Sequence, residues 1–219
     1  MKVLVFDTET TGLPIGYNPS ITETEKWPHI LQISFILYDD DTNAILEIKD
    51  NIISIDNSIE ISEKSIEIHG LTRTKCNKKG IMIKDALIEF NNALQKADLV
   101  VGHNISFDKR VVMVECIRQN MPQYFTRFGY RKPEYCTMKM NTELCAIEKI
   151  NVKTGEKYFK YPNLSELHEK LFGNNPKGTH DSMADILICI RCCEKIRNDI
   201  DYTKSGCSKF KELYNLYCR

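Results

Sequence analysis

The sequence predicts an α/β fold in which helices flank a mixed sheet. Three apolar runs rich in β-branched residues are separated by polar segments, which is typical of an antiparallel meander; they are Lys2–Phe6, Ile30–Tyr38 and Ala44–Ile55. A short, wholly apolar run, Leu99–Val101, follows. It is flanked by amphipathic segments, which predicts a buried parallel strand between two helices, Lys84–Ala97 and Phe107–Asn120. The sheet should therefore combine antiparallel and parallel strands.

The second half of the chain predicts one more strand and further helices. Tyr135–Met138 is a candidate fifth strand, and Met140–Ile147 is a candidate short helix. Asn163, followed three residues later by a glutamate, predicts the start of a helix that ends at Gly173. A long apolar stripe predicts a last strong helix over Thr179–Arg197.

The composition is that of an ordinary globular protein. The 219 residues carry equal numbers of basic and acidic residues, so binding of nucleic acid must use local patches or metal ions. We assign residues 1–198 to one domain and residues 199–219 to a C-terminal helix or tail packed on it. The stretch before Asp7 is too short for a secretory signal, and no apolar run is long enough to cross a membrane. We therefore expect an intracellular protein, cytoplasmic or nuclear, that is not secreted.

The chain has nine cysteines, which is an odd number. We interpret these cysteines as reduced thiols. Cys189, Cys192 and Cys193 are clustered in the sequence. They lie in an apolar helical stretch with no second Cys/His pair nearby, and we favour buried or surface thiols over a zinc site.

The first predicted strand stops at two acids one residue apart, Asp7 and Glu9. Side chains at positions i and i+2 of a strand point to the same side, so both carboxylates can aim at one point. Two bare carboxylates so close repel each other, and a divalent cation between them removes that cost. Their hard oxygen atoms suit Mg²⁺ or Mn²⁺. The alternative is that both are ordinary polar residues at a strand end, and this motif by itself leaves both interpretations open.

Two further acids and a histidine stand at the ends of predicted elements. Asp108 lies in the first turn of the helix that follows the buried strand, and Asp185 lies in the last strong helix. His180 precedes Asp185 by five residues, and in one continuous helix the two would point about 140° apart. We therefore place His180 on the loop that leads into the helix. A mobile histidine beside a metal site suits a general base near neutral pH.

Three segments, FDTETTGLP, HNISFD and HDSMAD, together resemble the three motifs of the DEDDh (DnaQ-like) 3′–5′ exonuclease family. The first motif is matched by Asp7–Glu9, the second by His103–Asp108, and the third by His180 with Asp185. The segment Ile68–Thr72 (IHGLT) also resembles a substrate-contacting segment of the proofreading-type members. The resemblance covers roughly residues 2 to 196.

This resemblance implies a ribonuclease H-like fold and a phosphodiesterase that removes nucleotides one at a time from a 3′ end. It implies two divalent cations, Mg²⁺ or Mn²⁺, and a nucleoside 5′-monophosphate product. It also implies that His180 takes the proton from the attacking water and that four acids hold the ions: Asp7, Glu9, Asp108 and Asp185. Two cations about 3.5–4 Å apart suit this chemistry, because they activate the water and stabilise the leaving oxygen.

Four further residues are candidates for contact with the substrate. Thr10 and Leu13 are expected to line the pocket of the terminal nucleotide, and family members place a wedge against the last base here. His69 is expected to meet a phosphate or the terminal sugar, or else to bond to its own loop. Asn104 either bonds the substrate sugar or caps the helix at Phe107, and we favour the cap. Asp181 has the wrong register for the metal, and we interpret it as a helix-start residue.

The sequence departs from the family pattern at two places. Lys64 stands where an acidic residue often precedes the histidine of the IHG segment, with Glu63 one place off. The segment Phe128–Tyr161 is longer than in minimal members and is a candidate substrate-side flap. Its basic residues could track a phosphate backbone or form a solvated charged face, and for most of them we favour the charged face; they are Arg127, Arg131, Lys132, Lys139, Lys149 and Lys153.

The leading hypothesis is a metal-dependent 3′–5′ exonuclease that acts on single-stranded DNA or frayed 3′ ends. Two alternatives stay open. One is an RNA exonuclease of the same family, and the other is a non-catalytic nucleic-acid-binding or polymerase-associated subunit. A polymerase or repair protein is a candidate partner, and the sequence leaves the oligomeric state open.

Overall fold

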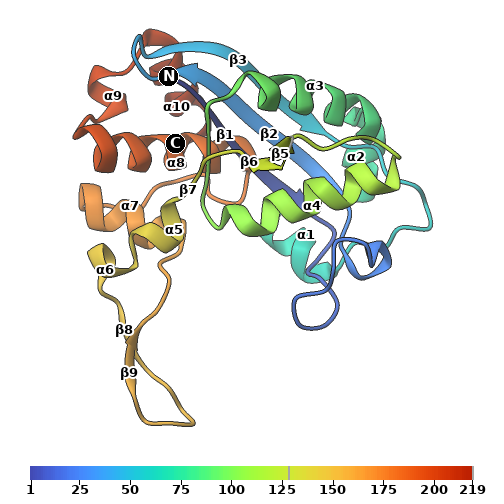
Figure 1. Ribbon diagram of the computed structural model, residues 1–219, viewed down its shortest axis with the longest axis horizontal. Helices are drawn as coiled ribbons and strands as arrows, with labels where there is room; N and C mark the ends of the chain where they lie inside the picture. The colour runs from blue at the N-terminus through green and yellow to red at the C-terminus, as the bar shows by residue number, and fades with distance from the viewer. Residues whose placement is uncertain (128, 219) are drawn as a thin grey trace.

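The computed structural model describes residues 1–127 and 129–218, and its centre is a five-stranded mixed sheet (Figure 1). The strand order is β3-β2-β1-β4-β7. The β1–β2 and β2–β3 pairs are antiparallel, whereas β4 is parallel to β1 and β7 is parallel to β4. The predicted meander and the parallel addition are both confirmed. The strands are β1 (Lys2–Thr10), β2 (Ile30–Asp39), β3 (Ala44–Ile52), β4 (Leu99–Gly102) and β7 (Glu134–Cys136).

Helices cover both faces of the sheet because side chains alternate along β1. Leu4 and Phe6 belong to the core cluster that includes residues of α3 (Ile83–Lys96) and α4 (Ile105–Arg118). Val3 and Val5 belong to the opposite cluster, beneath α8 (Ser182–Asn198). The buried β1 strand therefore lies between two apolar layers. This arrangement confirms the predicted α/β class with a ribonuclease H-like mixed sheet.

The C-terminal part of the chain packs on the α8 face. Asn163 and Glu166 form the predicted capping box of α7 (Leu164–Phe172), and Gly173 ends this helix at a φ of 75°. Beyond α8 come α9 (Tyr202–Ser205) and α10 (Ser208–Tyr217). Their buried side chains Tyr202 and Phe210 join the core cluster beneath α8. The division of the chain at residue 198 stays a prediction.

Several predicted boundaries are wrong. The first strand continues to Thr10, because its pairing with β2 persists to the end of that strand, across an irregularity after Glu9. The lysine-rich segment before Gly80 forms a helix, α2 (Arg73–Lys79), which the Thr72 side chain caps by accepting from the Lys75 amide. Before it comes α1 (Glu63–His69). Residues 140–147, predicted as one helix, contain the end of α5 (Thr137–Met140) and α6 (Thr142–Cys145).

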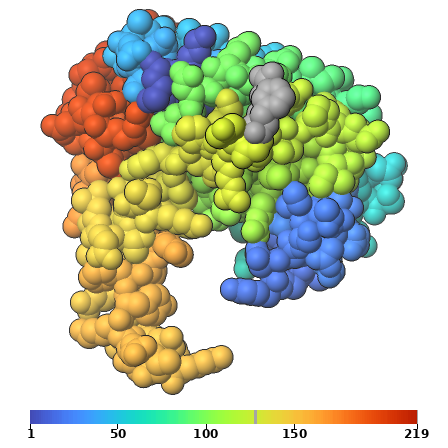
Figure 2. Space-filling model, in the orientation of Figure 1, coloured from blue at the N-terminus to red at the C-terminus, as the bar shows by residue number. Residues whose placement is uncertain are grey.

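Two small hairpins lie outside the main sheet. One joins β5 (Thr126–Arg127) to β6 (Tyr130–Arg131), and Phe128, where the predicted flap begins, lies outside the described residues. The other joins β8 (Glu148–Ile150) to β9 (Lys157–Phe159). Figures 1 and 2 show this second hairpin projecting well away from the body of the protein.

All nine cysteines are free thiols, and Cys189, Cys192 and Cys193 are buried in α8. In the described ranges, no helix combines the length and the apolar character needed to span a membrane.

Replacing Phe90 with alanine should lower the free energy of unfolding by about 3–5 kcal/mol, because the change leaves a large cavity in the core. The Phe90 ring is fully buried, and its centroid lies 4.9 Å from that of Phe6 and 5.7 Å from that of Phe35. Urea denaturation measures the loss. The control Ile88→Ala changes a half-exposed residue of the same helix and should cost much less. Equal losses in the two variants would contradict this account of the core.

Candidate active site

Three carboxylates from two elements converge at one end of β1. Asp7 and Glu9 follow Val5 at alternate positions of the strand, so they point toward the face that α8 covers. Asp185 lies in the first turn of α8. One carboxylate oxygen from each of Asp7, Glu9 and Asp185 lies within 4.8 Å of the other two. These three side chains form a group that is compact enough to hold one metal ion.

The fourth predicted acid, Asp108, enters from the other side of β1. It is 3% exposed, in the first turn of α4, and its Oδ1 accepts hydrogen bonds from the Thr8 hydroxyl at 2.7 Å and the Thr8 amide at 3.1 Å. Thr8 lies between Asp7 and Glu9 and points to the α4 face, so one strand positions acids on both sides. Asp108 is not part of the three-residue group, although its charge reaches Asp7 and Glu9.

The loop before α8 carries His180 at the rim of the carboxylate cluster. His180 is exposed, as part of a turn with a φ of 72°, and the helix begins only at Ser182. The His180 amide donates to Asp185 Oδ2 at 3.2 Å, which ties the loop to the cluster and leaves the imidazole outside that bond. Asp181 caps α8 by accepting from the Met183 and Ala184 amides, as expected of a helix-start residue.

Burial raises the pKa of each of the four acids, and the charges of neighbouring acids raise it further at Asp7, Glu9 and Asp185. Burial, followed by the charges of Asp108 and Asp185, holds the pKa of Asp7 well above its usual range. Burial and then the charges of Asp185 and Asp108 raise the pKa of Glu9 to about 8. Burial raises the pKa of Asp108 to about 7 against the opposing effect of the Thr8 hydrogen bonds, and it also raises that of Asp185 to about 7. The cluster therefore holds protons at neutral pH unless another positive charge replaces them.

The donor set fits a divalent cation. Asp185 Oδ1 is buried, and no hydrogen-bond partner for it exists among the described residues. An unpartnered buried carboxylate oxygen is costly, and it belongs to a side chain that is grouped with Asp7 and Glu9, which offer further oxygens. Oxygen donors of this kind suit Mg²⁺ and Mn²⁺ better than softer metals. A cation here would supply the missing partner and relieve the repulsion.

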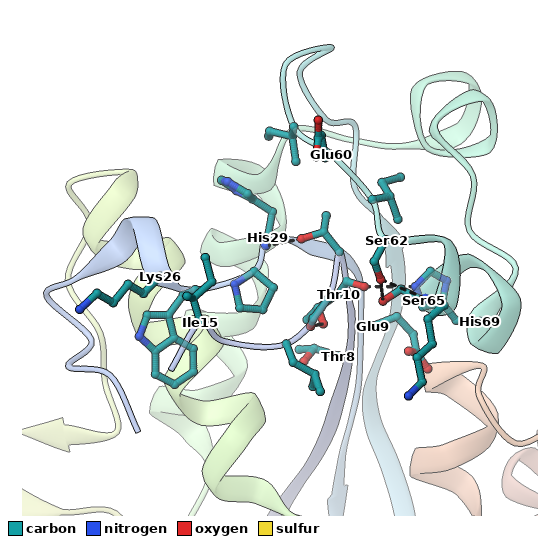
Figure 3. A pocket seen from close by; sticks show the side chains of 18 of the residues that line it. Thr8, Glu9, Thr10, Ile15, Lys26, His29, Glu60, Ser62, Ser65 and His69 are labelled. Atoms are coloured by element: carbon teal, nitrogen blue, oxygen red, sulfur yellow. Dashed lines mark hydrogen bonds between the residues drawn. The ribbon is translucent and has the colours of Figure 1, made fainter. Parts of the chain in front are cut away.

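A large pocket opens beside Glu9 (Figure 3). Its volume is about 1190 Å³, which exceeds the roughly 300–1,000 Å³ of most small-molecule sites. Figure 3 shows Ile15, Lys26 and His29 on one side of it and Ser62, Ser65 and His69 on the other. A second groove, of about 360 Å³, lies between the segment after β1 and α4, where Asn104, Arg110 and Lys139 line it. Leu13 lines both hollows and is 80% exposed.

The predicted substrate residues all border these hollows. Thr10 is buried in the wall of the large pocket, where its hydroxyl donates to the Gly12 carbonyl at 2.8 Å. His69 also lines this pocket, and both its ring nitrogens bond within the protein. Nδ1 accepts from the Leu71 amide at 3.0 Å, so Nε2 carries the proton that Thr10 O accepts at 3.1 Å. Asn104 occupies the N-cap position of α4 at a φ of 64° but makes no side-chain capping bond, so the favoured capping interpretation is wrong.

Several residues that shape the site were not identified from the sequence. Arg118 donates to the carbonyls of Thr24 and Trp27 at 2.6 Å and to that of Pro28 at 3.0 Å, which fastens the loop that forms one wall of the pocket. Arg118 also bonds to the buried Glu115 at 2.7 Å and to His29 Nδ1 at 3.2 Å. An arginine and a glutamate three residues apart on a helix give no local sign of such long-range contacts. Thr8 could have been suspected, because it lies between the two acids of the first motif.

His103 connects the second motif to the projecting hairpin. Its Nε2 donates to the Pro162 carbonyl at 3.1 Å, and its Nδ1 accepts from the Thr137 hydroxyl at 3.0 Å. Burial lowers the pKa of His103 to about 4, so the ring is neutral and keeps this pair of hydrogen bonds. Pro162 directly follows the hairpin, whose base is thereby fixed to the end of β4.

The fold and this site define a class of protein: nucleases with a ribonuclease H-like fold and an acidic centre. A family model described as Exonuclease (RNase_T) matches residues 4–193. The chain belongs to this family of hydrolytic exonucleases, and the resemblance to the DEDDh (DnaQ-like) 3′–5′ exonucleases is confirmed. Acidic clusters that take divalent cations are a feature of the family. Among curated proteins, none matches the chain.

Solved structures of exonuclease I share the fold. The E. coli enzyme in complex with a dT13 oligonucleotide gives a TM-score of 0.67 at 18% identity, over 90% of this chain and 42% of that chain. Its complex with dA16 gives 0.64 at 17% identity, over 98% and 42%. The moderately thermophilic enzyme from Methylocaldum szegediense gives 0.63 at 16% identity, over 93% and 42%. The chain thus spans less than half the length of these exonuclease I chains.

Divalent cations should stabilise the protein more at pH 8 than at pH 5.5. In the unfolded chain carboxyl groups titrate near pH 4. In the folded, metal-free protein burial raises the pKa of Glu9 to about 8 and that of Asp108 and Asp185 to about 7. The folded state therefore binds more protons than the unfolded state over this range. As pH rises through the folded pKa values, the acids lose their protons and repel one another, so the free energy of unfolding falls. A bound divalent cation relieves this repulsion, and its stabilising effect should therefore be larger at pH 8. Thermal unfolding with Mn²⁺ or with chelator measures the difference.

The variant Asp185→Asn should lose most of the Mn²⁺-dependent rise in Tm and weaken its pH dependence, because it removes one charged ligand. Glu169→Gln is the matched control, since Glu169 is an exposed acid on α7. The cation site would be contradicted if Asp185→Asn and the wild type responded to Mn²⁺ alike.

Proposed function

We propose that the protein is a metal-dependent 3′–5′ exonuclease that hydrolyses phosphodiester bonds at single-stranded or frayed 3′ ends, with DNA as the preferred substrate. The observation that carries the proposal is the convergence of three carboxylates, with their oxygens within 4.8 Å of one another, at the edge of a pocket large enough for a nucleotide. The product would be a nucleoside 5′-monophosphate.

The four acids would hold two divalent cations, Mg²⁺ or Mn²⁺. Asp7, Glu9 and Asp185 supply the compact group of oxygens, and Asp108 adds a fourth carboxylate from the α4 side. When bound, such a pair supplies positive charge both for the attack of water and for the departure of the 3′ oxygen. Thr8 acts as a positioning residue, because its hydroxyl and amide orient Asp108.

His180 is the proposed general base. Its backbone is tied to Asp185, while its exposed side chain lies on the turn at the rim of the cluster. The imidazole would take the proton from the attacking water and release it to solvent. This division of roles lets the loop move while the acids stay fixed.

The two hollows on either side of Leu13 suggest where the strand binds. The large pocket would take the terminal nucleotide, against Thr10 and the wall that His69 supports through the Thr10 carbonyl. The second groove would take the preceding nucleotide, with Asn104 among its lining residues. Leu13 would lie between the two bases, because it lines both hollows. A preference for DNA is supported by the dT13 and dA16 complexes of exonuclease I.

A gel assay with 5′-labelled 20-mers tests the proposal. Single-stranded DNA, paired DNA, DNA with a 3′ mismatch and RNA would each be incubated with Mg²⁺, Mn²⁺ or chelator. We expect a ladder that shortens from the 3′ end, only with metal, and fastest on single-stranded DNA.

Asp108→Asn should abolish the ladder while the fold is kept, because asparagine still accepts from Thr8 but loses the charge. A ladder from that variant would refute the metal assignment. No ladder from folded wild-type protein would favour a binding subunit, and RNA as the fastest lane would identify an RNA exonuclease.

Replacing His180 with alanine should lower kcat by about 10²–10⁴-fold, the usual contribution of a general base. It should also flatten the rising limb of the pH–rate profile, because histidine is the side chain that normally gains or loses charge near neutral pH. The measurement is kcat across pH 5.5–9 at saturating Mn²⁺. An unchanged rising limb would remove His180 from this role, even if the rate fell.

A further inference from the structure

The β8–β9 hairpin, residues 147–161, forms an arm that the proposed chemistry does not use. Every residue from Glu148 to Phe159 is exposed. The arm is nevertheless ordered by its own bonds: the Lys160 amide donates to the Ile147 carbonyl at 3.0 Å, and the Asn151 amide donates to that of Glu156 at 2.8 Å. At the tip, the Asn151 side chain accepts from the Lys153 and Thr154 amides. The base of the arm is held to the body of the protein by the Lys160–Glu166 ion pair at 2.6 Å and by Ile147, which packs against a core cluster that includes Leu167. The exposed part, residues 148–159, is therefore a defined surface on a fixed base.

The two faces of the arm differ in chemistry. Residues directly opposite each other in an antiparallel pair share a face. One face pairs Lys149 with Tyr158, which is 51% exposed. The other face carries Ile150, Phe159 and an ion pair between Lys157 and Glu148 at 3.1 Å. Among the described residues Lys149 forms no ion pair within 4.0 Å, although its positive charge helps to lower the pKa of Glu166 near the base of the arm. This face therefore presents an exposed lysine beside an exposed aromatic ring.

The charge of the arm differs from that of the whole chain. Residues 147–161 hold four lysines and two glutamates, whereas the chain as a whole has as many acids as bases. Lys153, at the tip, is exposed like the lysine of the first face. An excess of lysines interspersed with exposed aromatic rings is the combination that binds single-stranded nucleic acid, because the cations meet phosphates and the rings stack on bases. A protein partner would not require this excess of positive charge.

The arm is fixed to the catalytic domain on the side where the strand would leave the site. The His103–Pro162 hydrogen bond joins its base to the end of β4, five residues before Asp108. Figure 2 shows a hollow between the arm and the segment that joins β1 to β2. The groove on the far side of Leu13 from the large pocket is lined by two cations, Arg110 and Lys139, and by no acid. Lys139 belongs to α5, which precedes the arm in the chain.

We propose that the arm binds the single-stranded part of the substrate upstream of the scissile bond, with Lys149 contacting a phosphate and Tyr158 stacking on a base. This inference rests on the proposed function, because that function sets the direction in which the strand runs. The strand would pass from the pocket over Leu13, along the groove with Arg110 and Lys139, and onto the arm. Substrates long enough to reach the arm would be bound more tightly than short ones.

The test compares Lys149→Ala/Tyr158→Ala with the matched control Lys157→Ala/Phe159→Ala. Each double variant removes one lysine and one aromatic ring from exposed positions of the same hairpin, but from opposite faces. Binding of fluorescein-labelled dT20 would be measured by anisotropy in chelator, so that no cleavage occurs. We expect the first variant to raise Kd about tenfold, as for one stacked base and one phosphate contact. The control should change Kd less than twofold.

Kinetics provide the second readout. For Lys149→Ala/Tyr158→Ala, the ratio of kcat/KM for dT20 to that for dT3 should fall about tenfold, and the control should keep the wild-type ratio. Equal weakening in both variants, or no weakening in either, overturns the proposal; the second result would leave the apolar face open to a protein partner. If wild-type protein cleaves nothing while only the first variant loses dT20 binding, the arm proposal stands and the proposed exonuclease activity fails.

Discussion

The constraint on which the site depends is the repulsion among four carboxylates that are withdrawn from water. Such a cluster would relax apart if its supports could move. Asp7 and Glu9 cannot, because both are paired with β2, and the residues just before them, Val3–Val5, are also paired with β4. Asp108 and Asp185 lie in the first turns of α4 and α8, where the helix dipole favours negative charge and offsets part of the cost. The fold therefore keeps the acids together, and protons or cations must supply the remaining stabilisation.

The same constraint separates the groups that perform chemistry from those that meet the substrate. The acids are on regular elements, whose backbone bonds hold them in place. Leu13 and His180 are on turns or loops, where movement is possible without disturbing the cluster. On one side of the pocket, Arg118 restricts movement of the loop Thr24–His29, because it donates hydrogen bonds to three of the loop's carbonyls. One wall of the pocket is consequently held by Arg118 of α4, and the other is held by the hydrogen bond of His69 to the Thr10 carbonyl.

The sequence predicted what depends on local pattern and missed what depends on distant contacts. The shared side of Asp7 and Glu9 and the first-turn position of Asp108 follow from strand and helix periodicity, whereas the grouping of the four acids was implied by the resemblance to the exonuclease family. The structure brings Asp7 and Glu9 together with Asp185 and leaves Asp108 outside this compact group. The placement of His180 before α8 followed from helix geometry. The bonds of Arg118 to a loop about 90 residues earlier leave no local pattern. The α2 helix has a lysine-rich sequence that resembles a solvated loop, and the Thr72 cap at its start is its clearest local signal.

Leu13 shows how exposure and position together carry meaning that neither has alone. Single exposed apolar residues are normal on protein surfaces and require no explanation. Leu13 differs because it follows the first motif directly and lines both hollows, one beside Glu9 and the other beside Arg110 and Lys139. The Leu13 side chain would be buried on both sides only when a ligand fills both hollows at once. Of the ligands consistent with the acids and the lysines, a nucleic-acid strand with one base on each side of the leucine meets that condition, and a free mononucleotide does not.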